Sequence, residues 1–345
     1  PQLDFCWGMV GALDQPVRLK SFMELQAAFE NTTKHFQGGA NDGWEAKKMV
    51  ELASVVTGGE EELSRRPVFS CVQCPISPLT FESGLVEAQV EFARAGIPVV
   101  AMAAAVAGLT SPVTLSGTIA QVNAENLASA VISQSAKKGA PWIYSSDSVP
   151  GDLSTGSIDY GAMEAPLLRT GAGQMGRYYG LPTMVSGVGI ESSTLHMSSV
   201  KEGVPHMVVQ AMVPSDLASG LGGLDQAAGA SFEQLVADAW IWDAAREFLR
   251  KFSADAAAIS FETIRDAGLD GNFLGKRHTM TRFKKEFIST SKREAQLSGH
   301  RRSEKPGNLL AKAREEVDRL LKEPRKPKAT REESARMTQL IRELR

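Results

Sequence analysis

The chain has 345 residues, of which 43% are hydrophobic and 23% charged, and its formal net charge is -2. These values are typical of a globular protein with a sizeable core, and the near-neutral balance argues against general nucleic-acid binding. Three cysteines favour a reducing compartment over a disulfide framework. The longest apolar run, at 98–109, is shorter than the roughly 18 to 20 residues of a membrane helix, and no signal peptide opens the chain. We therefore expect a cytoplasmic protein without a nucleic-acid or membrane partner.

Short β-rich runs alternate with longer helical patterns along most of the chain. The pattern at 84–95 has apolar residues at helical spacing and ends before Gly96, a C-cap-type glycine. A regular alternation of this kind predicts a parallel sheet covered by helices, either as a barrel or as an open doubly wound sheet. Strands are predicted at 5–10, 33–37, 68–73, 99–104, 142–146, 183–187 and 217–221, and helices at 17–30, 43–57, 84–95, 118–137, 161–179 and 203–213.

The last part of the chain departs from this alternation. An amphipathic helix is predicted at 309–321, followed by a charged, proline-containing linker at 322–330 and a further helical pattern. The helix at 309–321 packs either on the outside of the same domain or on another subunit. We expect a catalytic domain at 1–255 and a helical extension at 256–345, which lies on that domain or at the interface of a homo-oligomer.

The stretch 187–203 and its surroundings carry a resemblance to a known family. Upstream lie Met-Glu-Ala-Pro at 163–166 and Gln-Met-Gly-Arg-Tyr-Tyr-Gly-Leu-Pro at 174–182, and downstream lies Gly-Gly-Leu-Asp at 222–225. In this order and spacing the chain resembles the trimethylamine methyltransferase family, whose founders carry pyrrolysine. The segment 187–197 matches the region that holds pyrrolysine in the founders, but ordinary residues occupy it here. The chain therefore resembles the non-pyrrolysine branch, which includes glycine betaine:corrinoid methyltransferases.

The resemblance covers about 29–321 and implies a fold. Family membership implies a (β/α)8 TIM-type barrel, one strand more than the seven predicted. The first residues read as mid-domain sequence without an initiator methionine. We therefore expect the barrel to lack its N-terminal part in this chain, together with any site residue that this part contributes.

The resemblance also implies a reaction. Cob(I)alamin on a separate corrinoid-binding protein would take a methyl group from a small quaternary amine, giving methylcobalamin and a demethylated amine. The quaternary nitrogen already carries its positive charge, so the protein would mainly orient the substrate and exclude water. No bound metal and no general base are expected. Glycine betaine is the substrate we predict, and its carboxylate needs hydrogen-bond donors.

The candidate site residues follow from this chemistry, and no catalytic residue is assigned. A quaternary ammonium cannot donate a hydrogen bond, so proteins hold it with aromatic faces and nearby carboxylates. His35 is expected at the carboxyl end of a strand, where barrel enzymes place chemistry, and His196 lies in the pyrrolysine-matching segment; a structural role is the alternative for both. The predicted substrate-binding residues are His35, Phe36, Tyr144, Asp147, Tyr160, Glu164, Glu191 and His196.

Two other functions fit the same sequence. One is a metal- or Schiff-base-dependent barrel lyase, for which Lys34 is the residue of interest. The other is a non-catalytic betaine-binding subunit. Cys71 and Cys74 form a Cys-x-x-Cys pair, but without a second pair they do not complete a zinc tetrahedron, and we interpret them as half-buried thiols near a strand end.

Overall fold

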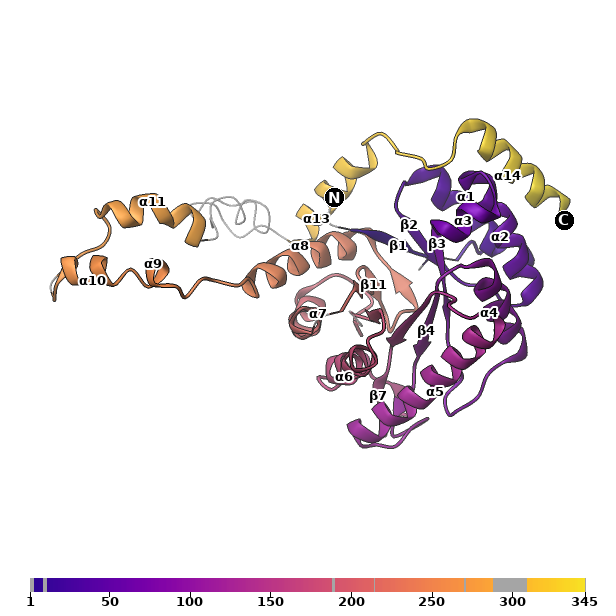
Figure 1. The fold of residues 1–345 in the computed structure, drawn as a ribbon, viewed down its shortest axis with the longest axis horizontal. Helices are drawn as coiled ribbons and strands as arrows, with labels where there is room; N and C mark the ends of the chain where they lie inside the picture. The colour runs from indigo at the N-terminus through magenta and orange to yellow at the C-terminus, as the bar shows by residue number, and fades with distance from the viewer. Residues whose placement is uncertain are drawn as a thin grey trace.

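The computed structural model describes residues 3–8, 11–187, 190–213, 215–269, 271–287 and 309–344. Its central feature is a seven-stranded parallel sheet that curls into an open half-barrel (Figure 1). The strand order follows the chain order, as a repeated βα unit requires. In sheet order the strands are β1 (Phe5–Trp7), β2 (His35–Gly38), β3 (Phe69–Gln73), β4 (Val99–Ala103), β6 (Trp142–Ser146), β9 (Thr183–Val185) and β10 (Leu217–Ala218).

β1 and β10 form the two edges of this sheet, and no strand within the described ranges joins them. The predicted parallel α/β architecture is confirmed, because each of the seven predicted strands overlaps a strand of the sheet. A closed (β/α)8 barrel, which needs eight strands, is not formed by the described residues.

The helices that connect the strands lie on the outer side of the curled sheet (Figure 1). Five of the six predicted helices agree with the structure within a few residues, but α7 begins at Met197, six residues before the predicted 203, and contains Pro205. The helices are the short 3-10 turn at Val17–Leu19, α1 (Lys20–Asn31), α2 (Gly43–Thr57), α3 (Glu60–Arg65), α4 (Ser83–Ala95), α5 (Leu115–Ala136), α6 (Ala165–Tyr178), α7 (Met197–Met212) and α8 (Phe232–Phe248).

Local chemistry sets the ends of these helices. The Asp42 carboxylate accepts from the backbone N–H of Glu45 and so caps α2. Helix α4 ends at Gly96, which has a φ of 77° in the left-handed region. A Cβ atom at Gly96 would lie 2.2 Å from the hydroxyl of Ser64, so both the backbone conformation and the space favour glycine.

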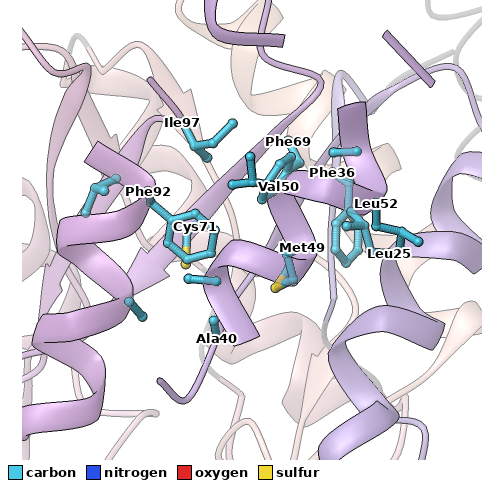
Figure 2. Close-up of a cluster of buried hydrophobic side chains, with 14 of the residues drawn as sticks. Leu25, Phe36, Ala40, Met49, Val50, Leu52, Phe69, Cys71, Phe92 and Ile97 are labelled. Carbon is cyan, nitrogen blue, oxygen red and sulfur yellow. The ribbon is translucent and has the colours of Figure 1, made fainter. Parts of the chain in front are cut away.

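Two apolar layers stabilise the sheet, one on each face. Alternation along β4 sends Val99 and Ala101 outward and Val100 and Met102 inward. The outer layer packs the sheet against α1, α2 and α4, and Figure 2 shows part of it, including Phe69. The inner layer lies on the concave side of the half-barrel. Its members are Phe5, Trp7, Val72, Cys74, Val100, Met102, Ile143, Met184 and Leu217.

Two small sheets extend from the carboxyl ends of the main strands, and neither was predicted. A three-stranded sheet joins β5 (Val106–Ala107), β7 (Val149–Asp152) and β8 (Ser157–Ile158), after β4 and β6. An antiparallel pair, β11 (Gly223–Leu224) and β12 (Gly229–Ala230), follows β10. Strands of two residues are too short to leave a periodic signal in the sequence.

The C-terminal third leaves the body and then returns to it. After α8 the chain forms α9 (Ala256–Ile259), α10 (Phe261–Ala267) and α11 (Arg277–Glu286), which project away from the half-barrel (Figure 1). Helix α13 (Leu309–Leu321) then packs against α8. Helix α14 (Arg331–Glu343) packs against α1 and α2, where it buries Met337 and Ile341 in the outer core. None of the helices in the described ranges is long and apolar enough to cross a membrane.

Candidate functional site

Charged side chains that carry the candidate site meet at the carboxyl ends of β6 and β9. Asp147 directly follows β6, and Arg169 lies in the second turn of α6. Their side chains form an ion pair, with Nη2 of Arg169 3.1 Å from Oδ1 of Asp147. The Arg169 side chain is 1% exposed and that of Asp147 15%, so the pair is largely withdrawn from water. Such a pair is costly to bury and strongly destabilising to break, which marks it as a specific feature of this region.

Tyr160 completes this cluster from the loop after β8. Its hydroxyl donates to Oδ2 of Asp147 at 2.9 Å. The guanidinium carbon of Arg169 lies 5.2 Å from the centre of the Tyr160 ring, within the range of a cation–π contact. Burial, followed by the negative charge of Asp147, raises the pKa of Tyr160 above its usual value. The phenol therefore remains neutral and keeps its proton on the Asp147 side.

Arg169 keeps donors that the described part of the chain does not use. Its Nη1 donates to the carbonyl oxygen of Gly187 at 2.8 Å. Its Nε and Nη2 are buried without a hydrogen-bond acceptor among the described residues, although Nη2 faces the charge of Asp147. A buried guanidinium with open donors is suited to a planar anion such as a carboxylate.

His206 in α7 is 1% exposed, and the positive charge of Arg169 influences its pKa. Burial, with a smaller contribution from Arg169, lowers the pKa of His206 to about 4, against the weaker opposing effect of the Gly187 and Ala162 backbone. Neither ring nitrogen has a hydrogen-bond partner in good geometry among the described residues. The imidazole is therefore neutral and offers one donor and one acceptor to whatever enters the site.

Glu191 fixes the backbone on which Tyr160 stands. Its Oε1 accepts from the backbone N–H of Tyr160 at 2.6 Å and from that of Gly161 at 3.3 Å, and its Oε2 accepts from the side-chain amide of Gln226 at 2.6 Å. A Cβ atom at Gly161 would lie 2.9 Å from the Glu191 side chain, so glycine permits this close approach. Glu191 therefore positions the site instead of presenting a free charge to it.

Cys74 approaches the same cluster from the end of β3. Burial, with a smaller contribution from Asp147, raises the pKa of its thiol to about 12. A thiol in this state is neutral and a poor nucleophile. Cys71 points into the outer core, and burial likewise raises its pKa to about 12. The two thiols thus lie on opposite faces of the sheet, as their odd spacing along a strand predicts.

Of the eight predicted site residues, the structure brings together Asp147, Tyr160 and Glu191. Glu164 lies near them in sequence, but it is exposed at the start of α6 and its side chain makes no capping bond. His196 is exposed just before α7. Neither Glu164 nor His196 is buried with the Arg169–Asp147–Tyr160 cluster.

The remaining three predicted residues lie elsewhere, which corrects their expected positions. Tyr144 and Phe36 point outward into the layer under the helices, where Tyr144 is fully buried and its hydroxyl donates to Oδ1 of Asn123 at 3.1 Å. His35 is the first residue of β2, because this strand begins at 35 and not at 33. It therefore lies at the amino end of the sheet, opposite the candidate site, where its Nε2 pairs with the hydroxyl of Ser70 at 2.9 Å.

Arg169 was missed at the sequence level, although a signal for it exists. Ala165, Leu168 and Ala172 are buried on one face of α6, and Arg169 shares that face. A charged residue on the buried face of an amphipathic helix needs a partner, and Asp147 is that partner.

Several exposed apolar side chains lie on the three-stranded sheet and on segments close to it in sequence. The side chains of Leu153 and Val113 both lie close to Gly108, and that of Leu109 lies against Gly151. Single exposed apolar residues are ordinary, but a contiguous group beside a polar site indicates a binding surface. We refer to this group as the apolar rim, and it consists of Leu109, Val113, Leu153, Ile158, Met163 and Leu167.

Across the ranges that the structure describes, no group of three or more His, Cys, Asp and Glu side chains is arranged to hold a metal ion. Lys34 lies at the amino end of the sheet with His35, and its Nζ donates to the carbonyl oxygen of Leu3. It is therefore remote from the Asp147 cluster.

Comparisons with known proteins agree on one family. Residues 4–343 match the family model described as trimethylamine methyltransferase (MTTB). The chain is 31% identical over 277 residues to a trimethylamine methyltransferase MttB of Desulfitobacterium hafniense, covering 79% of this chain and 56% of the relative. It is 28% identical over 277 residues to a glycine betaine methyltransferase of the same species, covering 80% and 58%. With trimethylamine methyltransferase MttB of Methanosarcina barkeri it shares 30% over 257 residues, covering 74% and 52%. The chain thus spans about half the length of these curated relatives.

Proposed function

The chain belongs to the trimethylamine methyltransferase family, and from this premise we propose that it moves a methyl group from a quaternary amine to a corrinoid on a separate protein. Glycine betaine is the substrate that the site favours. The observation that carries this choice is the Arg169–Asp147–Tyr160 cluster, which offers opposite charges and an aromatic face within one small volume. Glycine betaine likewise carries a fixed cation and a carboxylate a short distance apart.

The cationic end of the substrate finds its partners in Tyr160 and Asp147. A quaternary ammonium is held by a ring face and by a nearby carboxylate, without hydrogen bonds. The face of Tyr160 is covered here by the guanidinium of Arg169. A substrate cation of similar size would take that position and would face the Asp147 carboxylate that now neutralises Arg169.

The carboxylate end finds its partners in Arg169 and His206. Nε and Nη2 of Arg169 are buried donors without acceptors among the described residues, and the neutral His206 ring has an unused N–H. A substrate carboxylate would satisfy these donors and would pair with the arginine in place of Asp147. Trimethylamine has no carboxylate, so it would leave the same donors unpaired, which costs about 1–3 kcal/mol per buried group.

The corrinoid would meet this site from the side of the apolar rim. When bound to its carrier protein, the corrinoid supplies the cobalt nucleophile that accepts the methyl group. The apolar rim beside the cluster fits a partner that brings a broad, largely apolar ring face and excludes water from the site. The residues of this chain have no proton to transfer in this step; they orient the amine and keep its C–N bond directed toward the rim.

No observation favours the lyase or the non-catalytic alternative. A Schiff base needs an amine in the site, and the Nζ of Lys34 lies at the opposite end of the sheet.

A direct assay tests the proposed function. Full-length protein is mixed with reduced cob(I)alamin and, one at a time, glycine betaine, carnitine and trimethylamine, and the formation of methylcobalamin is followed by its absorbance. We expect methyl transfer from glycine betaine and none from trimethylamine. Transfer from trimethylamine alone would contradict the carboxylate argument, and binding without transfer from any amine would support the non-catalytic subunit.

A further inference from the structure

The turn between β11 and β12, at 225–228, has an uncommon backbone conformation. In the described ranges five non-glycine residues have a positive φ, and three of them are consecutive in this turn. The φ angles are 52° at Asp225, 54° at Gln226 and 65° at Ala227. Residues other than glycine rarely adopt this region, and they persist there only where the surrounding structure holds them. The turn should therefore have specific partners.

Three hydrogen bonds join the turn to the segment 190–192, which precedes α7. The backbone N–H groups of Asp225 and Gln226 donate to the carbonyl oxygens of the last and the first residue of this segment, both at 3.0 Å. The side-chain amide of Gln226 donates to Oε2 of Glu191, the residue between them, at 2.6 Å. The turn thus binds each residue of the segment, and Gln226 supplies two of the three donors.

Helix α7 and β11 hold the same segment from other directions. Ile190 is 1% exposed and packs with Leu224 of β11 and Met207 of α7. The carboxylate of Glu202, also in α7, accepts from the backbone N–H of Glu191 at 2.9 Å. The backbone of the segment is therefore fixed, and the Glu191 side chain extends from it toward the candidate site.

Glu191 transmits these contacts to Tyr160. While its Oε2 binds Gln226, its Oε1 accepts from the two backbone N–H groups at 160–161. The terminal torsion of a glutamate side chain has only broad preferences, so a bond to one carboxylate oxygen restricts the direction in which the other one faces. Since Oε1 holds the backbone of Tyr160, that direction affects where the tyrosine ring lies.

From these contacts we infer that Gln226 is a positioning residue, which fixes the Tyr160 ring for the substrate cation by acting through Glu191. The inference rests on the proposed function for the identity of the ligand. The turn at 225–228 is exposed, whereas the cluster around Tyr160 is largely buried. A contact at the surface thus helps to set the geometry of a site inside the molecule, as sites that bind or react with precision require.

Three substitutions of Gln226 vary the donor while they keep the backbone N–H. In full-length protein, Gln226→Ala should raise the dissociation constant of glycine betaine, measured by calorimetry, roughly threefold to tenfold, the range expected for one lost hydrogen bond. Gln226→Lys keeps a donor for the Glu191 carboxylate and should remain within about twofold of the wild type. Gln226→Glu opposes two carboxylates and should weaken binding more than Gln226→Ala.

Gln339→Ala is the matched control for this series. Gln339 is exposed on α14 and likewise donates to a glutamate, Glu343, at 3.0 Å. Its substitution should leave the dissociation constant unchanged. Wild-type affinity in Gln226→Ala, or equal weakening in Gln226→Ala and Gln226→Lys, would overturn the inference.

A double-mutant cycle separates positioning of the ring from a general effect on the fold. In a Tyr160→Leu background the ring is absent, so Gln226→Ala should cause no further rise in the dissociation constant. If Gln226→Ala weakens binding equally with and without the ring, Gln226 does not act through Tyr160 and the inference is wrong.

Nuclear magnetic resonance tests the same contact without any ligand. The chain has four tyrosines, so protein labelled with ¹³C in the tyrosine rings gives few signals, and Tyr160→Phe identifies that of Tyr160. Gln226→Ala should shift the Tyr160 signal and leave that of Tyr178, which is 81% exposed. An unmoved Tyr160 signal would refute the inference. A shifted signal in a protein that fails to bind glycine betaine would support the positioning of Tyr160 and contradict the proposed substrate.

Discussion

The Arg169 guanidinium covers the ring of Tyr160 at 5.2 Å while both side chains bind the two oxygens of the Asp147 carboxylate. This arrangement satisfies the negative charge of Asp147 but leaves donors of Arg169 open. Each of the three groups thus contacts both of the others, and Arg169 alone of the three retains buried donors without an acceptor among the described residues. Under the proposed function, a substrate that carries both charges would enter this cluster without changing its net charge.

The substitution Arg169→Lys keeps the positive charge beside Asp147 but removes the planar pair of donors. We expect kcat/KM for glycine betaine to fall by about 10- to 100-fold, because a hydrogen bond to a charged group contributes roughly 1.5–3 kcal/mol. Arg177→Lys in the same helix is the control, since Arg177 is 51% exposed and outside the cluster. An unchanged kcat/KM in the Arg169 variant would remove this arginine from the carboxylate subsite.

Two substitutions of Tyr160 separate its ring from its hydroxyl. Tyr160→Phe keeps the aromatic face and loses the bond to Asp147, so glycine betaine binding should weaken only slightly. Tyr160→Leu removes the aromatic ring as well, so the dissociation constant of glycine betaine, measured by calorimetry, should rise further. The additional loss of binding free energy should match that of a cation–π contact, about 0.5–2 kcal/mol. Equal effects of the two substitutions would argue against the ring as a cation partner.

The apolar rim predicts a difference between free and protein-bound corrinoid. Leu153→Asp places a charge on a side chain that is 64% exposed and outside the Asp147 cluster. Methyl transfer to free cob(I)alamin should be retained, while transfer to the corrinoid-carrying protein should require a higher concentration of that protein. Val131→Asp serves as the control, because Val131 is 66% exposed on α5 and is not part of the apolar rim. Equal loss with both acceptors would instead assign Leu153 to the fold.

Asp238 predicts a pH dependence of stability. Burial raises the pKa of Asp238 to about 7, and bonds from the Gly222 backbone and the Gln234 side chain offset this only in part. Because the pKa of this carboxyl is higher in the folded state than its ordinary value of 3.8, its protonated form contributes to the stability of the fold. This contribution is complete below pH 3.8 and is lost as the pH rises through about 7.

In Asp238→Asn the side chain cannot ionise. As the pH rises from about 5 to about 7, the free energy of urea unfolding should fall more steeply in the wild type than in this variant. The difference in slope should reach about 1.4 kcal/mol per pH unit, because the wild type releases the Asp238 proton when it unfolds and the variant has no such proton to release. Asp243→Asn, in the same helix, provides the comparison. Parallel pH profiles for the wild type and Asp238→Asn would contradict the assignment.

The fold was predictable because its signals are local. The strand predicted at 142–146 coincides with β6, and the helix predicted at 309–321 coincides with α13. Both have uninterrupted periodic patterns with clear boundaries. Small errors in a strand boundary matter more for the site than for the fold. The strand predicted at 33–37 begins at 35 in the structure, and this difference of two residues places His35 at the amino end of the sheet instead of the carboxyl end.

The site was less predictable because its contacts join distant segments. Asp147 was among the predicted residues, but its partner Arg169 comes from a helix whose facing side depends on the packing of α6 against β6 and β9. Tyr144 failed for the related reason that alternation along a strand does not say which face is the inner one. Periodicity predicts that side chains alternate, and tertiary packing decides which of them face inward.

The last helix has a consequence for how the protein is made. Met337 and Ile341 of α14 complete the same apolar layer as Phe22 and Leu25 of α1, and the backbone amides of Lys328 and Ala329 bind the carbonyl oxygen of Phe29. Some 300 residues separate these partners along the chain, and such distant contacts close slowly. During translation, α1 therefore keeps an uncovered flank until α14 has left the ribosome. Until then, the flank of α1 remains accessible to chaperones and proteases.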